Sequence, residues 1–443
     1  MDEDSLQGYR GRLKVALKAI GAGIGDFVKV ESKNTIYEGS LMPRLESDDE
    51  HHIVLKLRNG YNLGVTFNAL TRVKRIGEAD KPEFSPPPLP SIKKGLPRVS
   101  IVSTGGTIAS RVDYTTGGVH AAISSRDLLS IVPELSDFAA VEADILYSVF
   151  SEDINSRHWT GMATMVLEKV NAGVAGIVIT HGTDTLGYSA AALSFSLRNL
   201  PVPVILVGSQ RSSDRPSSDA ATNLVGVVTA AVNAPFAEVV LGMHETTSDT
   251  GVVFHRGTKV RKLHTSARYA FQSVNVRPLA KVAEGKVEMF ENDYRRRNDG
   301  TLKIINGFEE KTGLVKFYPG LQPNLVEWYV DEGYKGLILE GTGLGHVSTR
   351  LFEVIDRAIK AGLYVGMTSQ CIWGRLNMNV YTTGRMLQRL GVEPLGDMLP
   401  ETAYVKLMWA LANSKDLESA KVLMQKNIAG EYSDRTLYTG RFG

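Results

Sequence analysis

The stretch Ile179-Thr-His-Gly-Thr-Asp-Thr-Leu186 decides the fold, because it separates two segments with different patterns. The apolar run before it, residues 174–179, is typical of a buried parallel strand. The run of small and apolar residues after it, 187–197, is long enough for a helix. In open α/β sheets ligands bind where a strand's carboxyl end turns into a helix, and exposed N–H groups there can stabilise an oxyanion. Thr183 and Thr185 are therefore candidates for a functional site, or simply for a helix cap.

The segments on both sides of this stretch alternate between strand and helix patterns, which predicts a doubly wound, mostly parallel α/β sheet. The expected strands are 99–103, 176–180, 202–208 and 238–243, and the expected helices are 159–171, 186–200 and 219–233. A looser polar part, 275–312, is interpreted as a hairpin or connection, and its run Arg295-Arg-Arg297 as a solvated turn. Beyond it, strands at 314–318, 336–340 and 364–368 and helices at 348–361, 401–411 and 415–425 predict a second, smaller α/β lobe.

The first eighty residues have a different pattern. A helix is expected at 9–20, followed by strands at 26–31, 36–42, 53–57, 61–67 and 71–76. An Asn59-Gly60 hairpin signal lies between two of these strands. Five short strands predict a small SH3/Sm-like β-barrel, which would contact RNA or serve as a docking module. Clustered prolines then mark a linker. The predicted layout is 1–82 barrel with N-terminal helix, 83–96 linker, 97–290 larger lobe, 291–312 connection, and 313–443 smaller lobe with its tail.

The composition bounds the function. The chain has 443 residues, with 50 Lys and Arg against 48 Asp and Glu, which gives a net charge of +2. So small a net charge is no electrostatic reason to expect nucleic-acid or membrane binding. One cysteine, Cys371, excludes an intrachain disulfide and fits a cytoplasmic protein. The acidic start, Met-Asp-Glu-Asp-Ser, does not resemble a signal peptide, and no apolar run is long enough for a membrane span.

A second glycine-rich turn carries candidate chemistry. Thr104-Gly-Gly-Thr-Ile-Ala109 directly follows an expected strand, and its paired glycines allow the backbone to approach a ligand closely. The turn lacks the spacing of a dinucleotide site or a phosphate loop, and no phosphate loop occurs elsewhere. Two strand-to-turn threonine sites in one sheet, Thr107 and Thr183 with Asp184, are therefore candidates for one functional site, and if ATP is used we expect another polypeptide to bind it.

These two turns resemble the two signatures of the L-asparaginase/glutaminase family, over roughly residues 97–427. The resemblance implies that Thr107 attacks a side-chain amide carbon and that no metal takes part. It further implies that Tyr114 is the lid tyrosine that helps to activate Thr107, and that a second triad consists of Thr183, Asp184 and Lys262. Ser151 would bind the substrate's α-carboxylate, and Glu152 and Asp184 would bind its α-ammonium group. Backbone N–H groups at Gly182 and Thr183 could hold the oxyanion.

Each of these residues also has a simpler interpretation. Lys262 lies among Lys259, Arg261 and His264, so it could belong to an ordinary solvated basic run. Tyr114 could be a surface tyrosine of a polar loop, and His181 is interpreted as structural.

The barrel and linker before the amidohydrolase part resemble the D-subunit family of archaeal glutamyl-tRNA(Gln) amidotransferases. This resemblance implies a glutaminase whose ammonia is used by the amidotransferase E subunit, the partner that binds ATP, Mg and most of the Glu-tRNA(Gln). It also implies self-association through the asparaginase-like domain, with two copies of each polypeptide. The alternatives are a freestanding cytoplasmic L-asparaginase and a non-catalytic scaffold.

Three positions depart from the pattern of secreted bacterial asparaginases. Glu152 stands where those enzymes often have glutamine. In those enzymes a glycine-rich turn completes a neighbouring protomer's site with polar side chains, and the matching turn of this chain has Leu344 and His346 in the corresponding places. The sequence therefore leaves open which chain closes the active site.

Overall fold

The computed structural model describes residues 6, 8–32, 35–44, 49–57, 62–78, 95–106, 108, 110–112, 119–121, 132–212, 217–298 and 300–436. The chain forms two compact units, one around the N-terminal residues and one around the remaining α/β part. The proline-rich linker and the Asn59-Gly60 turn lie outside the described residues.

The N-terminal unit is built on a five-stranded antiparallel sheet with strand order β4-β3-β2-β1-β5. Its elements are α1 (Gly11–Ala19), β1 (Phe27–Ser32), β2 (Thr35–Leu41), β3 (His52–Leu57), β4 (Asn62–Thr66) and β5 (Arg72–Gly77). Leu13 and Leu17, four residues apart on α1, are buried in one cluster with Val28, Val30 and Ile53. Alternate residues of the strands point into this core, so the helix and all five predicted strands are confirmed.

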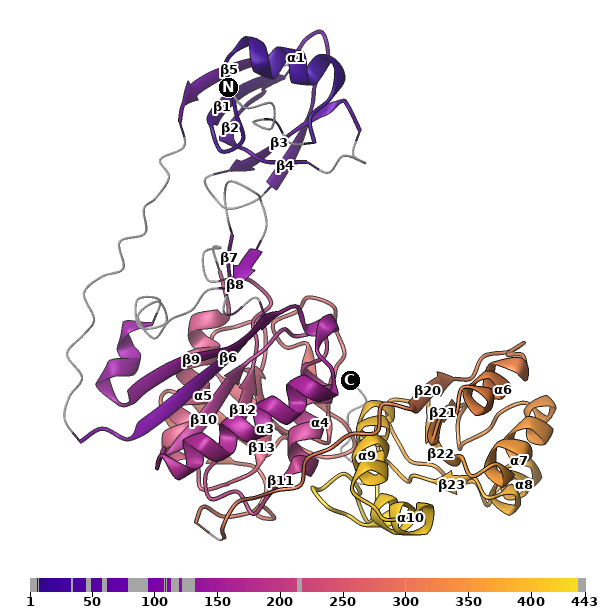
Figure 1. Ribbon diagram of the computed structural model, residues 1–443. Coiled ribbons are helices and arrows are strands. Elements are labelled where there is room, and N and C mark those ends of the chain that lie inside the picture. Colours follow the sequence, from indigo (N-terminus) through magenta and orange to yellow (C-terminus); the bar gives the residue numbers. More distant parts are fainter. Residues whose placement is uncertain are drawn as a thin grey trace. The chain divides into compact units, whose positions relative to one another are not determined.

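The larger lobe contains an eight-stranded sheet with strand order β18-β17-β14-β13-β12-β10-β6-β9 (Figure 1). Its strands are β6 (Arg98–Gly105), β9 (Ala140–Val149), β10 (Gly176–Thr180), β12 (Val204–Val207), β13 (Val239–His244), β14 (Val252–Arg256), β17 (Ala280–Ala283) and β18 (Lys286–Met289). Strands β9, β6, β10, β12 and β13 are parallel. The other three extend the sheet in antiparallel order. Strands β17 and β18 form a hairpin within the segment 275–312, as one of the two interpretations of that segment expected, whereas β14 was not indicated by the sequence patterns.

The register of the parallel strands brings three turns to one edge of the sheet. Thr180 on β10 is opposite Ser103 on β6 and opposite Val207 on β12. The turns that follow, which begin at Thr104, His181 and Gly208, therefore leave the sheet side by side. The α-helices of this lobe in the described part of the chain are α3 (Ser156–Asn171), α4 (Leu186–Ser196), which follows β10, and α5 (Ala220–Asn233), which follows β12. Helix α4 ends before its predicted limit, since residues 197–198 form strand β11 and pair with β19 (Lys303–Ile304).

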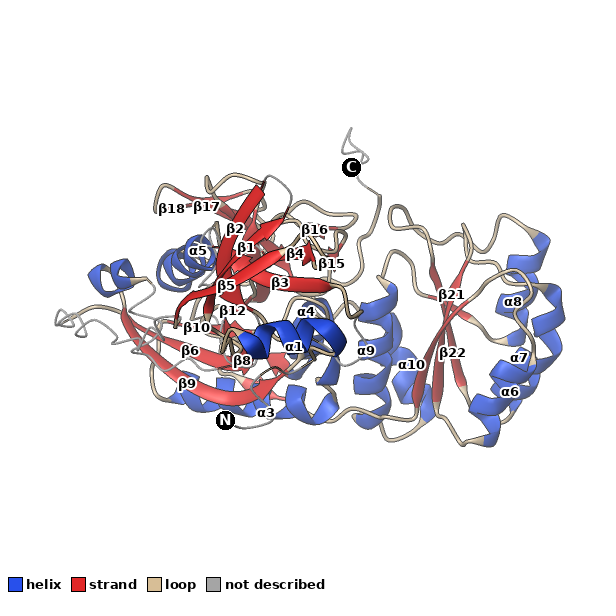
Figure 2. Cartoon of the chain, turned by 90° about the horizontal axis from the view of Figure 1, so that it is seen from above, coloured by secondary structure: helices blue, strands red, loops and turns tan. Residues whose placement is uncertain are grey.

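The smaller lobe has a four-stranded parallel sheet in the order β20-β21-β22-β23. Figure 2 shows α6, α7 and α8 on one side of strands β21 and β22, with α9 and α10 on the other. The elements are β20 (Thr312–Lys316), α6 (Asn324–Asp331), β21 (Gly336–Gly341), α7 (Phe352–Lys360), β22 (Tyr364–Ser369), α8 (Thr382–Leu390), β23 (Glu393–Pro394), α9 (Pro400–Ala412) and α10 (Leu417–Gln425). The predicted second α/β lobe is confirmed, and helices α6 and α8 were missed.

Helix α9 and the segment after α10 connect the two lobes. Helix α9 packs against α4 of the larger lobe and against β21 of the smaller one. The Lys259 ammonium lies 2.7 Å from the Asp397 carboxylate, and both side chains are buried. Thr402 on α9 donates a hydrogen bond to the carbonyl of Thr258. The two lobes therefore share a continuous packed interface. No helix in the described part of the chain has the length and apolar character needed to span a membrane.

The run Arg295–Arg297 is structural, which corrects its interpretation as a solvated turn. The Arg297 guanidinium donates hydrogen bonds to the carbonyls of Ala175, Ala231 and Ala234, at 2.6, 2.5 and 2.5 Å. Two of these carbonyls belong to the C-terminal end of α5, where backbone acceptors have no partner within the helix. Arg295 donates to the carbonyl of Ile428, and Arg296 lies over the ring of Tyr294. Two of the three charges therefore hold backbone in place.

Replacing Arg297 with methionine is expected to reduce the free energy of unfolding by about 2–3 kcal/mol, because three partly buried carbonyls lose their charged donor. Arg296→Met is the matched control, since this neighbouring side chain is exposed. The midpoint of urea unfolding, followed by circular dichroism, measures both changes. Equal, small shifts for the two variants would contradict the structural role of Arg297.

Candidate active site

Two glycine-containing turns touch at the carboxyl edge of the larger sheet. Gly105 and Gly106 have φ angles of 108° and 83°, a backbone region that favours glycine. A Cβ on Gly106 would lie 2.4 Å from the backbone nitrogen of Gly182. The Thr104 hydroxyl donates to the carbonyl of Thr180, at 2.9 Å, and ties the two strand ends together. Gly106 is therefore required for the first signature turn to pack against the second, whereas Gly105 is required for close packing against Val149 of β9.

The proposed nucleophile Thr107 and the lid residue Tyr114 lie outside the described residues. The described chain reaches Gly106, directly before Thr107, and this glycine packs against Gly182.

Gly106→Ala is expected to lower ammonia release by about 100-fold, since the methyl group would displace the backbone on one side of the site by the order of an ångström. Gly173→Ala is the control, because Gly173 has a similar φ of 77° and nothing within 4 Å of the position that a methyl group would take. Steady-state assays at saturating glutamine compare the two variants. Activity of Gly106→Ala equal to that of the control would show that this contact is dispensable.

The second signature turn forms a compact polar triad with a distant strand. The Lys262 ammonium lies 2.8 Å from the hydroxyl oxygen of Thr183 and 2.8 Å from a carboxylate oxygen of Asp184. The Lys262 side chain is 14% exposed, whereas that of Asp184 is 70% exposed. Since Lys262 donates to Thr183, the threonine's own hydrogen is free to point at a ligand. The predicted grouping of these three residues agrees with this geometry.

The basic run around Lys262 is not a solvated face. Lys262 ends β15 (Val260–Lys262), which pairs with β16 (Phe271–Ser273). Lys259 is paired with Asp397, and Arg261 lies 2.9 Å from Glu401. Successive strand residues point to opposite faces, so Arg261 and Lys262 reach different partners. Of the four basic residues in this run, only His264 is exposed. The interpretation of Lys262 as part of an ordinary solvated basic run is therefore wrong.

The residues proposed to hold the substrate's ionic groups begin at the end of β9. Ser151 opens a short 3₁₀ helix, η3 (Ser151–Asp153), and is 4% exposed. A Cβ on Gly182 would lie 2.9 Å from the Ser151 hydroxyl oxygen, so the serine adjoins the signature turn. Thr185 donates its hydroxyl to the carbonyl of Ser151, at 2.5 Å. Glu152 is exposed beside this contact, as a residue that meets a substrate from solvent must be.

Neither threonine serves as a side-chain cap of helix α4. Thr185 occupies the N-cap position, but its side chain makes no capping hydrogen bond. Its hydroxyl bonds to Ser151, and the hydroxyl of Thr183 bonds to Lys262. The cap interpretation of these residues is therefore wrong.

His181 is a structural residue. Its Nδ1 donates to the carbonyl of Gly182, at 2.7 Å, and its Nε2 accepts from the hydroxyl of Ser189, at 2.8 Å. The Trp159 indole donates to the same hydroxyl. Burial lowers the pKa of His181 to about 4, so the ring is neutral near pH 7 and shapes the turn instead of exchanging protons.

Gly208 is a site residue that the sequence patterns did not indicate. It follows β12, and a Cβ on it would lie 2.7 Å from the methyl carbon of Thr183. The next residue, Ser209, is also buried. The only sequence signal was a glycine directly after a strand, which is common and carries no information about its neighbour in space.

The turn Gly341–His346 of the smaller lobe has left-handed glycines at Gly343 and Gly345, with φ angles of 52° and 105°. His346 contacts the ring of Tyr381 edge to face, and Thr383 lies 3.3 Å from its Nδ1. These contacts hold His346 within its own lobe. Which chain closes the active site therefore stays a question of assembly.

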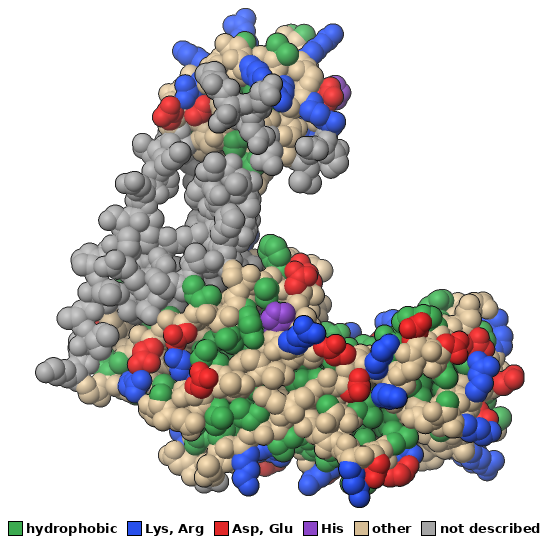
Figure 3. Space-filling model, viewed as in Figure 1, with side chains coloured by type: hydrophobic (Ala, Val, Ile, Leu, Met, Phe, Trp, Pro, Cys, Tyr) green, Lys and Arg blue, Asp and Glu red, His purple; other side chains and the backbone are tan. Residues whose placement is uncertain are grey.

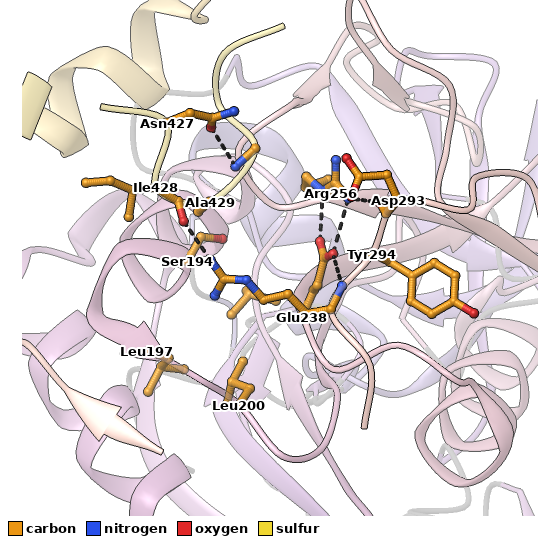
Figure 4. A pocket seen from close by; sticks show the side chains of 13 residues that line it. Ser194, Leu197, Leu200, Glu238, Arg256, Asp293, Tyr294, Asn427, Ile428 and Ala429 are labelled. Atoms are coloured by element: carbon orange, nitrogen blue, oxygen red, sulfur yellow. Dashed lines mark hydrogen bonds and ion pairs between the residues drawn. The ribbon is translucent and has the colours of Figure 1, made fainter. Parts of the chain in front are cut away.

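A cavity of about 280 Å³ lies elsewhere in the α/β unit, at the edge where β13 begins and β14 ends (Figure 4). This is the opposite edge from the signature turns. Arg256 forms a two-point ion pair with Glu238, and Arg295 bonds to the carbonyl of Ile428. Its polar groups thus bind one another and anchor the C-terminal segment, so the cavity is separate from the proposed chemistry.

Three family models match consecutive parts of the chain. The GatD N-terminal domain matches residues 22–76, the N-terminal domain of asparaginase matches 98–295, and the glutaminase/asparaginase C-terminal domain matches 311–424. Together they reproduce the order of the barrel and the two lobes. Curated relatives extend over almost the whole length. The D subunit of a glutamyl-tRNA(Gln) amidotransferase from Metallosphaera sedula is 50% identical over 97% of both chains.

The chain belongs to the D-subunit family of glutamyl-tRNA(Gln) amidotransferases. A further member of this family, from Pyrococcus horikoshii, is 48% identical over 96% of this chain and 99% of its own. Among solved structures, a thermostable L-asparaginase from Thermococcus kodakarensis matches with a TM-score of 0.69 and 32% identity. It covers 76% of this chain and all of its own. The D-subunit family thus adds an N-terminal module to an asparaginase-like fold, as the sequence predicted.

Proposed function

We propose that this chain is the glutaminase component of a tRNA-dependent amidotransferase, releasing ammonia that a partner uses with ATP to convert Glu-tRNA(Gln) to Gln-tRNA(Gln). The observation that carries the proposal is the Thr183–Lys262–Asp184 triad, held at hydrogen-bond distance in a chain related over its full length to amidotransferase D subunits. A catalytic triad needs this arrangement, in which a hydroxyl, a base and an orienting carboxylate lie within one contact of each other.

In the proposed reaction the Thr107 hydroxyl oxygen attacks the side-chain amide carbon of glutamine, with Tyr114 assisting the removal of its proton. The tetrahedral oxyanion is stabilised by backbone N–H groups at Gly182 and Thr183. Ammonia leaves after the amide nitrogen gains a proton, and an ester between Thr107 and the glutamyl group remains. Water then cleaves the ester, which restores the Thr107 hydroxyl and releases glutamate.

Thr183, Lys262 and Asp184 would manage protons around this centre. Lys262 donates to Thr183, so a proton can pass along that hydrogen bond when the free hydrogen of Thr183 moves to the reacting group. Asp184 keeps the ammonium in place and, with Glu152, would bind the substrate's α-ammonium group. The Ser151 hydroxyl would bind the α-carboxylate. Charge-assisted hydrogen bonds of this kind are roughly twice as strong as neutral ones.

The proposal assigns ATP, Mg and most of the tRNA contacts to the partner, the amidotransferase E subunit, and places the complex in the cytoplasm with two copies of each polypeptide. In the described part of the chain no cluster of His, Cys, Asp or Glu is arranged to hold a metal ion. Figure 3 shows Lys and Arg mixed with Asp and Glu over the visible face of the α/β lobes, not a broad basic surface for RNA.

The experiment is ammonia release from glutamine and from asparagine by the isolated chain, and by the chain with the E subunit, ATP and Glu-tRNA(Gln). We expect little release alone and glutamine hydrolysis in the complex. A freestanding asparaginase, the alternative favoured by the asparaginase-like fold, would hydrolyse asparagine rapidly without the partner. Absence of ammonia under all conditions would leave only the scaffold interpretation and would refute the proposed function.

A further inference from the structure

A chain of polar contacts runs behind the Thr183–Lys262 pair and takes no part in the steps above. It begins at Gly208, whose α-carbon adjoins the methyl group of Thr183. The carbonyl of Gly208 accepts a hydrogen bond from the Asn223 amide on α5, at 3.0 Å. Both residues are fully enclosed by α5 and the ends of β12 and β13. The position of the backbone under Thr183 therefore depends on Asn223.

The orientation of the Asn223 amide is determined by its neighbours. Its nitrogen faces three acceptors, namely the carbonyl of Gly208, the Asp219 carboxylate at 3.2 Å and the sulfur of Met243 at 3.6 Å. Its oxygen must therefore face His244, whose Nδ1 lies 2.6 Å away. An amide oxygen only accepts hydrogen bonds, so Nδ1 of His244 carries a hydrogen. Asp219 also accepts from the backbone nitrogen of Gln210, at 3.0 Å, and so holds the same turn.

The other nitrogen of His244 faces a carboxylate. Nε2 lies 3.0 Å from Asp249, whose pKa is lowered by the hydrogen bond from His244 and by the nearby Arg268. His244, 0% exposed, thus contacts Asn223 through one ring nitrogen and Asp249 through the other. The remaining charged group beside it on the strand, Glu245, is paired with Lys281 on β17.

The chain of contacts ends on the hairpin that carries Lys262. Arg268 lies between β15 and β16, and its guanidinium contacts the Asp249 carboxylate at 2.8 Å and the carbonyl of Thr247 at 3.3 Å. Strands β15 and β16 pair Lys262 with Phe271, so Arg268 and Lys262 move with one hairpin. These contacts therefore connect the turn beneath Thr183 with the hairpin that carries Lys262, in addition to the direct hydrogen bond between these two residues.

We propose that His244 is a positioning residue, which links the Gly208 turn to the Lys262 hairpin and so fixes the distance between Thr183 and Lys262. The inference rests on the proposed function of these two residues. Asn223 and Asp249 are the two contacts through which His244 acts, and Arg268 is the terminal anchor. None of the four needs to touch substrate. Their loss changes the geometry of proton transfer, while Ser151 and Glu152, which would bind the substrate, stay in place.

The test uses Asp249→Ala and Arg268→Gln in the complete complex. The Asp249 side chain is 62% exposed, so its replacement by alanine opens no cavity in the core. We expect each variant to lower kcat for glutamine hydrolysis about 10- to 100-fold, the effect of a sub-ångström to ångström displacement, with KM within about twofold. The double variant should lose little more than either single one, because both act through one path.

Two matched controls separate positioning from general stability. Asp356→Ala removes a partly exposed carboxylate from an ion pair on α7, and His255→Gln replaces another buried histidine, on β14, that bonds only to Ser273. Both controls should keep kcat, whereas His244→Gln should lose it. Unchanged kcat in Asp249→Ala and Arg268→Gln, or an equal loss in His255→Gln, would overturn the proposal.

A second readout is independent of activity. Crystal structures of the wild-type protein and of Asp249→Ala compare the distance between the Thr183 hydroxyl and the Lys262 ammonium, 2.8 Å in the wild type, which should lengthen in the variant. An unchanged distance would overturn the proposal whatever the kinetics show. If wild-type complex released no ammonia, the proposed function would fail, while this distance would still report on the bridge.

Discussion

Lys262→Met is expected to reduce glutamine-dependent ammonia release by about 10²- to 10⁴-fold, the range attributed to a positioned proton-transfer group. Methionine has a similar length and no donor, so Thr183 and Asp184 both lose the partner that lies 2.8 Å away. The measurement is kcat and KM in the complete complex. The loss should fall mainly on kcat, since Lys262 contacts Thr183 and is not among the groups proposed to bind the substrate's charges.

Lys281→Met is the matched control for this variant. Lys281 also forms an ion pair with a carboxylate, that of Glu245, and lies on β17 of the eight-stranded sheet. Its loss should change turnover by less than about twofold, as for an ordinary partly exposed ion pair. A Lys262→Met protein that kept more than a tenth of wild-type turnover would remove Lys262 from the mechanism and leave the chain without its proposed base.

Lys406→Met is expected to reduce the free energy of unfolding by about 3–5 kcal/mol, the cost of leaving a buried charge without its partner. The Lys406 ammonium lies 2.6 Å from the Glu431 carboxylate, and both side chains are fully buried. Lys406 also donates to the carbonyls of Met424 and Lys426, at 2.9 and 2.7 Å. Glu431 in turn accepts from the backbone nitrogens of Ile428 and Ala429.

Urea unfolding of three variants tests this prediction. Lys406→Met, Glu431→Gln and their combination form a double-mutant cycle, and the combined cost should be clearly smaller than the sum of the single costs. The control is Lys360→Met, which breaks an exposed pair with Asp356 on α7 and should cost less than about 1 kcal/mol. Additive losses in the cycle would show that the Lys406–Glu431 contact contributes no coupling.

The buried pair explains how the polar C-terminal segment joins the fold. Besides Glu431, the segment is held by Arg198 and Arg295, which donate to the carbonyl of Ile428, and by Arg375, which donates to Ser433 and Asp434. From the sequence, residues 431–443 are expected to form a polar tail that docks or frays. The described part, up to residue 436, docks through Glu431, Ser433 and Asp434. Charges that look solvated in the sequence here satisfy backbone carbonyls between lobes.

Local patterns were sufficient for the elements whose signal lies within one segment. The buried strand Gly176–Thr180 is uniformly apolar, and the helix after it is rich in small residues, so both were predicted close to their observed limits. The five strands of the N-terminal sheet were predicted because their residues alternate between core and surface. Strand β14 and helices α6 and α8 were missed. They are short, and their burial depends on neighbours distant in the sequence.

By itself, the sequence determined the α/β class, the order of the modules and the two glycine-threonine turns. These depend on hydrophobic periodicity and on backbone angles that glycine permits, which are properties of neighbouring residues. The family resemblance pointed to Lys262 as the partner of Thr183, and the tertiary structure places the two at hydrogen-bond distance. Only the tertiary structure decided that Gly208, Asn223 and His244 lie behind them. Strand order and register bring together residues about eighty positions apart, and no local pattern encodes that distance.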